Sequence, residues 1–104
     1  MSKQRAKGTA AETAVVKYLR SVGFEHSDRA PLRGKNDQGD ITGIGQVCVE
    51  VKNHQTINLA DFLDQARREG KGWAAYSVAW IKRRGKASPA DWYVVMDGAT
   101  FCDM

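Results

Sequence analysis

The sequence predicts a single α/β domain in which a mixed β-sheet is flanked by helices. Two segments carry apolar residues at helical spacing, and short β-branched segments lie between and after them. The length of 104 residues fits one ordinary domain with one core, so we expect residues 1–104 to form a single unit. The expected order is one helix, three strands, a second helix and two further strands.

The first helix is predicted over residues 8–22. Its apolar residues recur at helical spacing: Ala11, Ala14, Val15, Tyr18, Leu19 and Val22. Gly23 follows the last of them and suits a C-terminal cap. The spacing of Thr9 and Glu12 matches a capping box, which gives Glu12 a structural role at the helix start.

The other elements follow from strand-like runs and from a second helical pattern. In chain order we predict a strand around Asp28–Leu32, two strands within Ile41–Lys52, a helix over Leu59–Glu69 ending at Gly70, a strand over Tyr76–Lys82, a basic loop over Gly85–Pro89 and a strand over Trp92–Met96. The second helix should place Leu59, Phe62, Leu63 and Ala66 on one face.

The stretch 39–53 sets charged residues into an apolar hairpin. Alternation along 47–52 puts the valines on one face, and Glu50 and Lys52 on the other together with Cys48. A three-residue turn at 44–46 would place Asp40 directly opposite Glu50. A two-residue turn would bury Asp40 among the valines, which is costly, so we favour the first register.

Two facing carboxylates repel each other and favour a bound cation. Oxygen ligands on a compact pair suit Mg²⁺ or Mn²⁺, and a neighbouring lysine can stabilise charge that develops on a phosphate. Asp40, Glu50 and Lys52 therefore suggest metal-assisted phosphodiester hydrolysis. The alternative is an exposed hairpin face with a weak cross-strand ion pair.

The same residues resemble a known pattern. Gly-Asp at 39–40, followed by Glu-Val-Lys at 50–52, resembles the PD-(D/E)XK nuclease superfamily. Residues 5–24 resemble the opening of the archaeal-type Holliday junction resolvases, in which a helix carries a catalytic glutamate and ends in Gly-Phe. The resemblance covers about residues 5–66 and implies a restriction-endonuclease-like core and Mg²⁺-dependent cleavage of branched DNA.

Site residues follow from this resemblance. It implies a catalytic set of three acids and one lysine: Glu12, Asp40, Glu50 and Lys52. It also implies that Mg²⁺, for which Mn²⁺ can substitute, is bound by the three acids and the carbonyl of Val51. Gln65 matches a polar position that some members use near the site.

The chain departs from the pattern at Gly39, where the superfamily motif has proline, and the segment 33–39 shows no clear match. Asp37 is an alternative to Asp40 as a ligand, although it falls in the loop.

A net charge of +4 and a pI near 9.3 agree with a polyanionic partner. The residues we expect to contact DNA are basic and lie in several clusters: Arg5, Lys7, Arg29, Arg33, Lys35, Lys82, Arg83 and Arg84. The three tryptophans are expected to serve packing rather than base stacking. Other functions remain open: a non-catalytic DNA-binding module of the same fold, a fork, flap or general nuclease, and a protein-interaction domain.

Composition also bounds the setting. Two scattered cysteines, Cys48 and Cys102, form neither a disulfide framework nor a zinc site, and no apolar run is long enough to span a membrane. We therefore expect a reduced, cytoplasmic protein. Resolving a four-way junction needs two matched incisions, so a homodimer is expected, with Trp92, Tyr93 and Phe101 as candidates for its interface.

Overall fold

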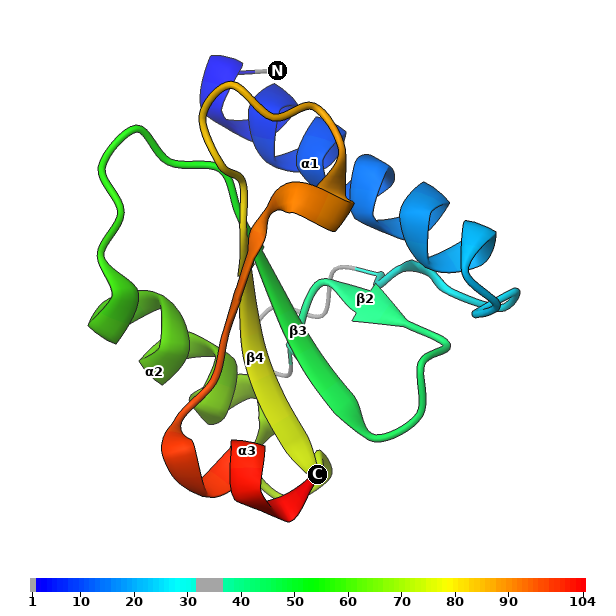
Figure 1. Ribbon diagram of the computed structural model, residues 1–104, viewed down its shortest axis with the longest axis vertical. Helices are drawn as coiled ribbons and strands as arrows, with labels where there is room; N and C mark the ends of the chain where they lie inside the picture. Colours follow the sequence, from blue (N-terminus) through cyan, green and yellow to red (C-terminus); the bar gives the residue numbers. More distant parts are fainter. Residues whose placement is uncertain (1, 32–36) are drawn as a thin grey trace.

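A computed structural model of the chain describes residues 2–31 and 37–104. At its centre lies a three-stranded mixed sheet in the order β3-β4-β5 (Figure 1). β3 (Val47–Lys52) runs parallel to β4 (Tyr76–Ile81), and β4 runs antiparallel to β5 (Tyr93–Val95). The expectation of an α/β fold with a mixed sheet flanked by helices is therefore confirmed at this level.

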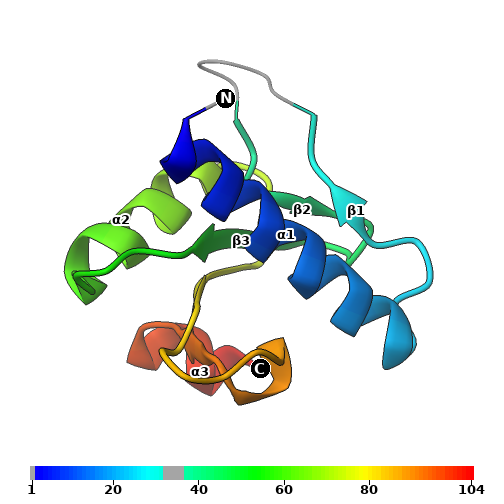
Figure 2. The same ribbon diagram turned by 90° about the horizontal axis from the view of Figure 1, so that it is seen from above.

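Two helices cover opposite faces of this sheet, with β3 between them in both views (Figures 1 and 2). α1 (Lys3–Ser21) packs against the face that carries Val49, Val51 and Val78, and together they form the larger core cluster. α2 (Leu59–Gly70) connects β3 to β4 and covers the other face. The alternation predicted along β3 is thus correct, and the strand sends its valines to α1 and its charged residues towards α2.

α1 begins five residues earlier than predicted. Ser2 caps it by accepting a hydrogen bond from the Arg5 N–H at 3.1 Å. Residues 3–8 are mostly polar helix formers, so the apolar pattern marked only the buried part of the helix. Thr9 therefore lies within the helix, and the capping box with Glu12 is wrong. The predicted end is confirmed, since the Phe24 N–H bonds the Leu19 carbonyl at 3.0 Å beyond Gly23.

The predicted hairpin between the two central strands is also wrong. β2 (Ile41–Thr42) pairs antiparallel with β1 (Asp28–Arg29), whereas β3 pairs with β4. The chain turns away between them at Gly43, whose φ is +80°, and a Cβ at this position would overlap the carbonyl of His26. This close approach holds the turn after β2 against the segment before β1, while β3 pairs with the longer β4.

The second half of the chain follows the prediction with three differences. Leu59 is exposed rather than buried on the inner face of α2. A 3₁₀ turn (Pro89–Asp91) and a terminal helix, α3 (Gly98–Asp103), were missed, because α3 is short and buries no residue that would give it a periodic apolar pattern. Within the described residues, no helix is long and apolar enough to cross a membrane.

The tryptophans serve packing, as expected. Trp92 is 8 % exposed and belongs to the larger core cluster. Each indole N–H donates to a backbone carbonyl: Trp73 to Glu69, Trp80 to Pro89 and Trp92 to Lys86. Trp92 is therefore mainly a core residue, although it also lines an apolar groove beside β5 together with Tyr93 and Val94.

Candidate active site

A cavity of about 450 Å³ lies beside β3, and we call it the active-site cavity. Its lining includes all six residues singled out for chemistry: Glu12, Asp40, Glu50, Val51, Lys52 and Gln65. They come from α1, the segment before β2, β3 itself and α2. Segments far apart in the sequence therefore converge on one hollow.

Asp40 reaches this cavity by a route other than the predicted hairpin. Its backbone N–H donates to the Val49 carbonyl at 2.7 Å, and its Oδ2 accepts a hydrogen bond from the Val51 N–H at 2.8 Å. Asp40 thus forms, at the edge of β3 opposite β4, the hydrogen bonds that a neighbouring strand would otherwise form. Asp40 lies beside Glu50 as predicted, although no ladder joins β2 to β3.

The backbone at Gly39 requires glycine rather than proline before this aspartate. Its φ is +90°, and an added Cβ would lie 3.0 Å from both the Cys48 Sγ and the Val49 carbonyl oxygen. Proline is restricted to a φ near −65°, so it does not fit this backbone. Glycine at this position lets Asp40 approach β3 closely.

Glu50 is the most confined charged group of the site. It is 2 % exposed, and its Oε1 has no hydrogen-bond partner among the described residues. Its Oε2 lies 3.6 Å from the Nζ of Lys52. Burial raises the pKa of Glu50 to about 9, helped by a hydrogen bond to Glu69 and by the charges of Asp40 and Glu69. A hydrogen bond between the carboxyl groups of Glu50 and Glu69 requires a proton on one of them. When both are ionised, the Oε1 of Glu50 has no donor among the described residues.

Asp40 shares this environment. Burial raises its pKa to about 6, and the charges of Glu12 and Glu69 add to this effect, while the Val51 N–H opposes it. The carboxyl groups of Glu12, Glu50 and Glu69 lie around Asp40, and a bound proton or a further cation would reduce the repulsion among them.

Lys52 is held in place by several contacts. Its Nζ donates to the Gln65 Oε1 at 2.6 Å and lies 5.6 Å from the centre of the Phe62 ring. Its side chain is only 13 % exposed. The interpretation of these charges as an exposed hairpin face with a weak ion pair is therefore wrong, and Gln65 lies where it can position the lysine.

Glu12 faces the same cavity from the middle of α1. It pairs with Arg29, a basic residue that the sequence predicts to contact DNA. Its Oε1 accepts a hydrogen bond from the Arg29 Nε at 3.0 Å. The side chains of Glu12 and Arg29 are 20 % and 44 % exposed. Glu12 is thus either a member of the site or simply the partner of Arg29.

Two substitutions separate these roles. If Glu12 acts in the site, Glu12→Gln should lower the single-turnover cleavage rate by about 100-fold, whereas Arg29→Ala should change it less than about threefold. A mere surface pair contributes less than about 1 kcal/mol, so in that case both variants would stay close to wild-type activity. Single-turnover kinetics with saturating enzyme and melting curves for both variants make the comparison.

Glu69 is a site residue that sequence reasoning missed. Its Oε1 accepts a hydrogen bond from the Gly39 N–H at 3.3 Å, and its carboxyl contacts Glu50. It thereby ties α2 to the segment that carries Asp40. The available signal was its spacing, because Glu69 follows Gln65 by four residues on α2 and so shares its face.

Two other residues raised by the sequence have no place in the chemistry. Cys48 is fully buried, and burial together with the nearby charge of Glu50 raises the pKa of its thiol to about 12, which rules out a ready nucleophile. Asp37 is exposed and is not among the residues that line the active-site cavity.

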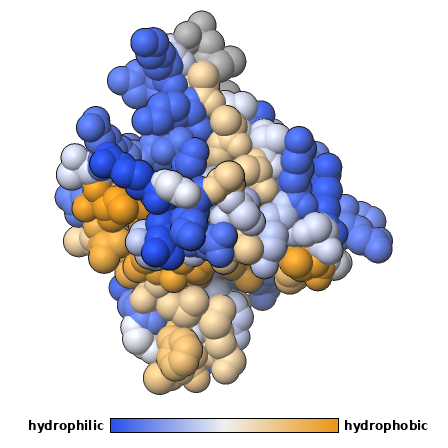
Figure 3. Space-filling view, turned by 45° about the horizontal axis from the view of Figure 1, so that its top comes forward, coloured by the Kyte–Doolittle hydropathy of each residue, from blue (hydrophilic) through white to orange (hydrophobic). Residues whose placement is uncertain are grey.

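The basic residues divide into distinct groups. Lys7 lines the active-site cavity, and Lys82 and Arg84 line a hollow next to it. The guanidinium of Arg83 lies over the ring of Tyr93 instead, and Arg5 is exposed on α1. Figure 3 shows hydrophilic side chains over much of the upper half of that view, with hydrophobic patches lower down. Arg33 and Lys35 lie outside the described residues.

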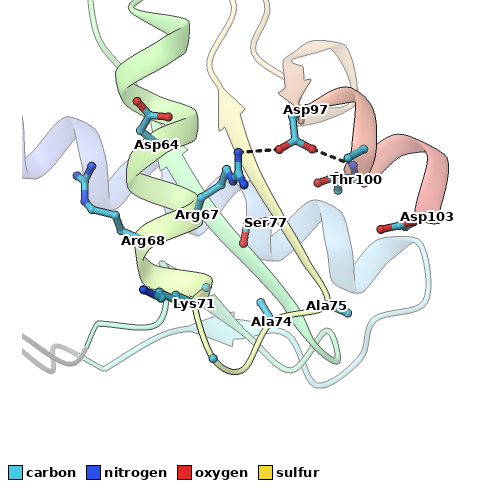
Figure 4. A pocket seen from close by; sticks show the side chains of 13 residues that line it. Asp64, Arg67, Arg68, Lys71, Ala74, Ala75, Ser77, Asp97, Thr100 and Asp103 are labelled. Atoms are coloured by element: carbon cyan, nitrogen blue, oxygen red, sulfur yellow. Dashed lines mark hydrogen bonds and ion pairs between the residues drawn. The ribbon is translucent and has the colours of Figure 1, made fainter.

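A larger cavity, of about 770 Å³, lies between α2 and α3 (Figure 4). There Arg67 pairs with Asp97 at 3.0 Å, and Asp97 also caps α3 through the Thr100 N–H. None of the residues predicted for chemistry lines it. The candidate site is therefore identified by its chemistry and not by its size.

The oxygen ligands in the active-site cavity suit a divalent metal that keeps several waters. Within the described residues, no three His, Cys, Asp or Glu side chains form a group that could hold a metal ion by themselves. Mg²⁺ usually takes one or two carboxylates and keeps several waters, so it needs no such group. Asp40, Glu50 and the carbonyl of Val51 fit this requirement, since the buried Oε1 of Glu50 has no hydrogen-bond partner among residues 2–31 and 37–104.

Comparison with known proteins gives no match, whether to a protein-family model, to a curated protein or to a solved structure.

Proposed function

We propose that this protein is a Mg²⁺-dependent endodeoxyribonuclease with a restriction-endonuclease-like core, and that it acts on branched DNA such as a four-way junction. The observation that supports the chemistry most strongly is the buried Oε1 of Glu50, which has no hydrogen-bond partner in the described part of the chain and lies next to Asp40 and Lys52 in one cavity. The sequence resemblance to junction resolvases supports the choice of substrate.

Each residue has a role that its contacts suit. Asp40, Glu50 and the Val51 carbonyl would hold the metal, and Glu69 keeps the segment of Asp40 against α2. A bound Mg²⁺ supplies a Lewis acid for the phosphoryl oxygen and lowers the pKa of a coordinated water.

Lys52 is oriented by Gln65 and stabilises the negative charge that develops on the phosphate. Glu12, once released from Arg29, can accept a hydrogen bond from the attacking water.

A panel of end-labelled DNAs tests this proposal. The protein is incubated with a four-way junction, a fork, a nicked duplex, a plain duplex and a single strand, with Mg²⁺ or EDTA, and the cuts are mapped. We expect Mg²⁺-dependent, paired incisions in the junction. Salt-sensitive DNA binding without cleavage would instead support a non-catalytic module, and a lack of both would support a protein-interaction domain.

We also propose that the protein acts as a homodimer. Exposed apolar side chains gather around the edge strand β5 and the start of α2, namely Ile57, Leu59, Tyr93 and Val94, and they line an apolar groove of about 560 Å³. An edge strand with an apolar rim can pair with its own copy about a two-fold axis.

The oligomeric state is measurable. Sedimentation is expected to show a dimer on the junction, and Val94→Lys should shift the protein towards the monomer and remove the second incision while the first remains. A monomer on the junction that makes single cuts would contradict the dimer and favour a fork, flap or nicking nuclease.

A further inference from the structure

We propose that the hollow next to the active-site cavity is a subsite for a backbone phosphate of the bound DNA strand, held chiefly by Lys7 and Arg84. This inference rests on the proposed function only in taking DNA as the ligand. The hollow measures about 490 Å³, and we call it the basic subsite.

The basic subsite and the active-site cavity are continuous. They share four lining residues: Lys7, Asn53, His54 and Gln55. Three of the four directly follow β3, so the groove begins at the end of the strand that carries Glu50 and Lys52. A strand whose phosphate lies in the active-site cavity can therefore place a neighbouring phosphate in the adjoining basic subsite.

The two hollows differ sharply in charge. The active-site cavity is lined by three acids, whereas the described residues that line the basic subsite include three cations and no acid. A metal can neutralise the phosphate at the acidic end, but a neighbouring phosphate needs cations from the protein. Lys7, Lys82 and Arg84 supply them, and the side-chain amides of Asn53 and Gln55 add hydrogen-bond donors.

Orientation within the loop after β4 makes this assignment specific. Arg83 directs its guanidinium to the Tyr93 ring, 5.6 Å from the ring centre, and does not line the subsite. Lys82 lines the subsite, but its Nζ also lies 5.8 Å from the centre of the Trp92 ring. Arg84 is exposed and lines the subsite. The sequence does not distinguish these three basic residues, whereas in the structure only Lys82 and Arg84 line the subsite.

Arg83 therefore provides a matched control for Arg84, since the two are adjacent and identical in charge. Binding is measured in EDTA with a labelled duplex and a junction over a range of salt concentrations, so that the result does not depend on cleavage. We expect Arg84→Ala to weaken binding by about five- to tenfold and to reduce the salt slope by about one, and Arg83→Ala to change the affinity less than about twofold.

A scan of the DNA locates the contact. Phosphates are replaced one at a time with neutral methylphosphonates. At one position, the methylphosphonate should weaken binding of the wild-type protein as much as Arg84→Ala does. The same replacement should not weaken binding of the Arg84→Ala variant any further. Millimolar inorganic phosphate at constant ionic strength should leave the affinity unchanged; displacement of DNA by it would indicate a site for free phosphate and overturn the proposal.

The outcomes separate this inference from the proposed activity. Equal losses in the Arg83 and Arg84 variants, or additive losses at every methylphosphonate position, would show a diffuse basic surface and overturn the subsite. If the wild-type protein cleaves DNA but the two variants bind alike, the subsite is wrong and the nuclease proposal stands. If only Arg84→Ala weakens binding and no DNA is cleaved, the subsite stands and the nuclease proposal is wrong.

Discussion

Asp40→Asn and Glu50→Gln are each expected to lower the cleavage rate at least about 100-fold while the fold is kept. Loss of residues that merely support metal ligands already costs about 10- to 100-fold, and these two carboxylates are the proposed ligands themselves. Asn at position 40 can still accept the hydrogen bond from the Val51 N–H through its amide oxygen, so the attachment to β3 survives. Single-turnover cleavage in Mg²⁺, with circular dichroism of each variant, makes the measurement.

The same Glu50→Gln variant should be more stable than the wild type at pH 8 when no metal is present. The pKa values of Asp40 and Glu50 are raised from 3.8 and 4.5 to about 6 and about 9, so the folded state holds protons that the unfolded chain has released. Their contribution therefore favours folding at about pH 4 and is lost as the pH rises towards 9. Because Gln does not ionise, Glu50→Gln should remove most of this fall in the free energy of unfolding with rising pH.

Melting temperatures measure this effect. An unsatisfied buried polar group costs about 1–3 kcal/mol, which predicts a rise of about 4–24 °C for Glu50→Gln at pH 8 and little change at pH 4. Mg²⁺ should stabilise the wild type but not the variant. The exposed Glu25, replaced by Gln, is the control and should change neither property. A variant that still responds to Mg²⁺ like the wild type would show that Glu50 is not a ligand.

Lys52→Ala should lower the single-turnover rate by about 10²- to 10³-fold and leave DNA affinity nearly unchanged. The ammonium group is mostly buried and fixed by Gln65, so it is placed for chemistry rather than for long-range attraction of DNA. Its loss also removes the cation 3.6 Å from Glu50, so we expect the loss of stability to be small at pH 4, where Glu50 is protonated, and to grow as the pH rises through about 9, where Glu50 ionises.

Gln65→Ala distinguishes the role of the lysine from its placement. This variant keeps the charge and loses the 2.6 Å hydrogen bond that orients it, so its rate should fall by less than that of Lys52→Ala. If Lys52→Ala weakens binding and leaves the rate at saturation unchanged, Lys52 is only a phosphate anchor.

The placement of the two central acids shows how far the sequence could lead. Strand alternation put Glu50 and Lys52 on one face correctly, because that period depends only on local backbone geometry. The neighbourhood of Asp40 and Glu50 was also predicted, but through a hairpin that does not form. Strand pairing depends on distant segments such as β4 and on the close approach of Gly43 to His26, and neither is visible in a local pattern.

The helices show the same limit. The apolar period located the buried part of α1 but not its polar first turns, so it assigned Glu12 to a cap instead of to the pair with Arg29. Glu69 escaped notice because its role depends on a contact between α2 and Gly39, thirty residues away in the chain. Charge composition predicted a basic surface but could not separate Arg83 from Arg84, since their directions are set by packing.

The most direct test of the central claim is single-turnover cleavage of a labelled four-way junction by wild-type protein and by Asp40→Asn, purified side by side. The proposal predicts paired incisions by the wild type in Mg²⁺, none in EDTA, and a rate at least about 100-fold lower for Asp40→Asn at equal DNA affinity. Cleavage that persists in Asp40→Asn or in EDTA, or wild-type protein that cuts no DNA in either Mg²⁺ or Mn²⁺, would contradict a metal-dependent nuclease site at Asp40 and Glu50.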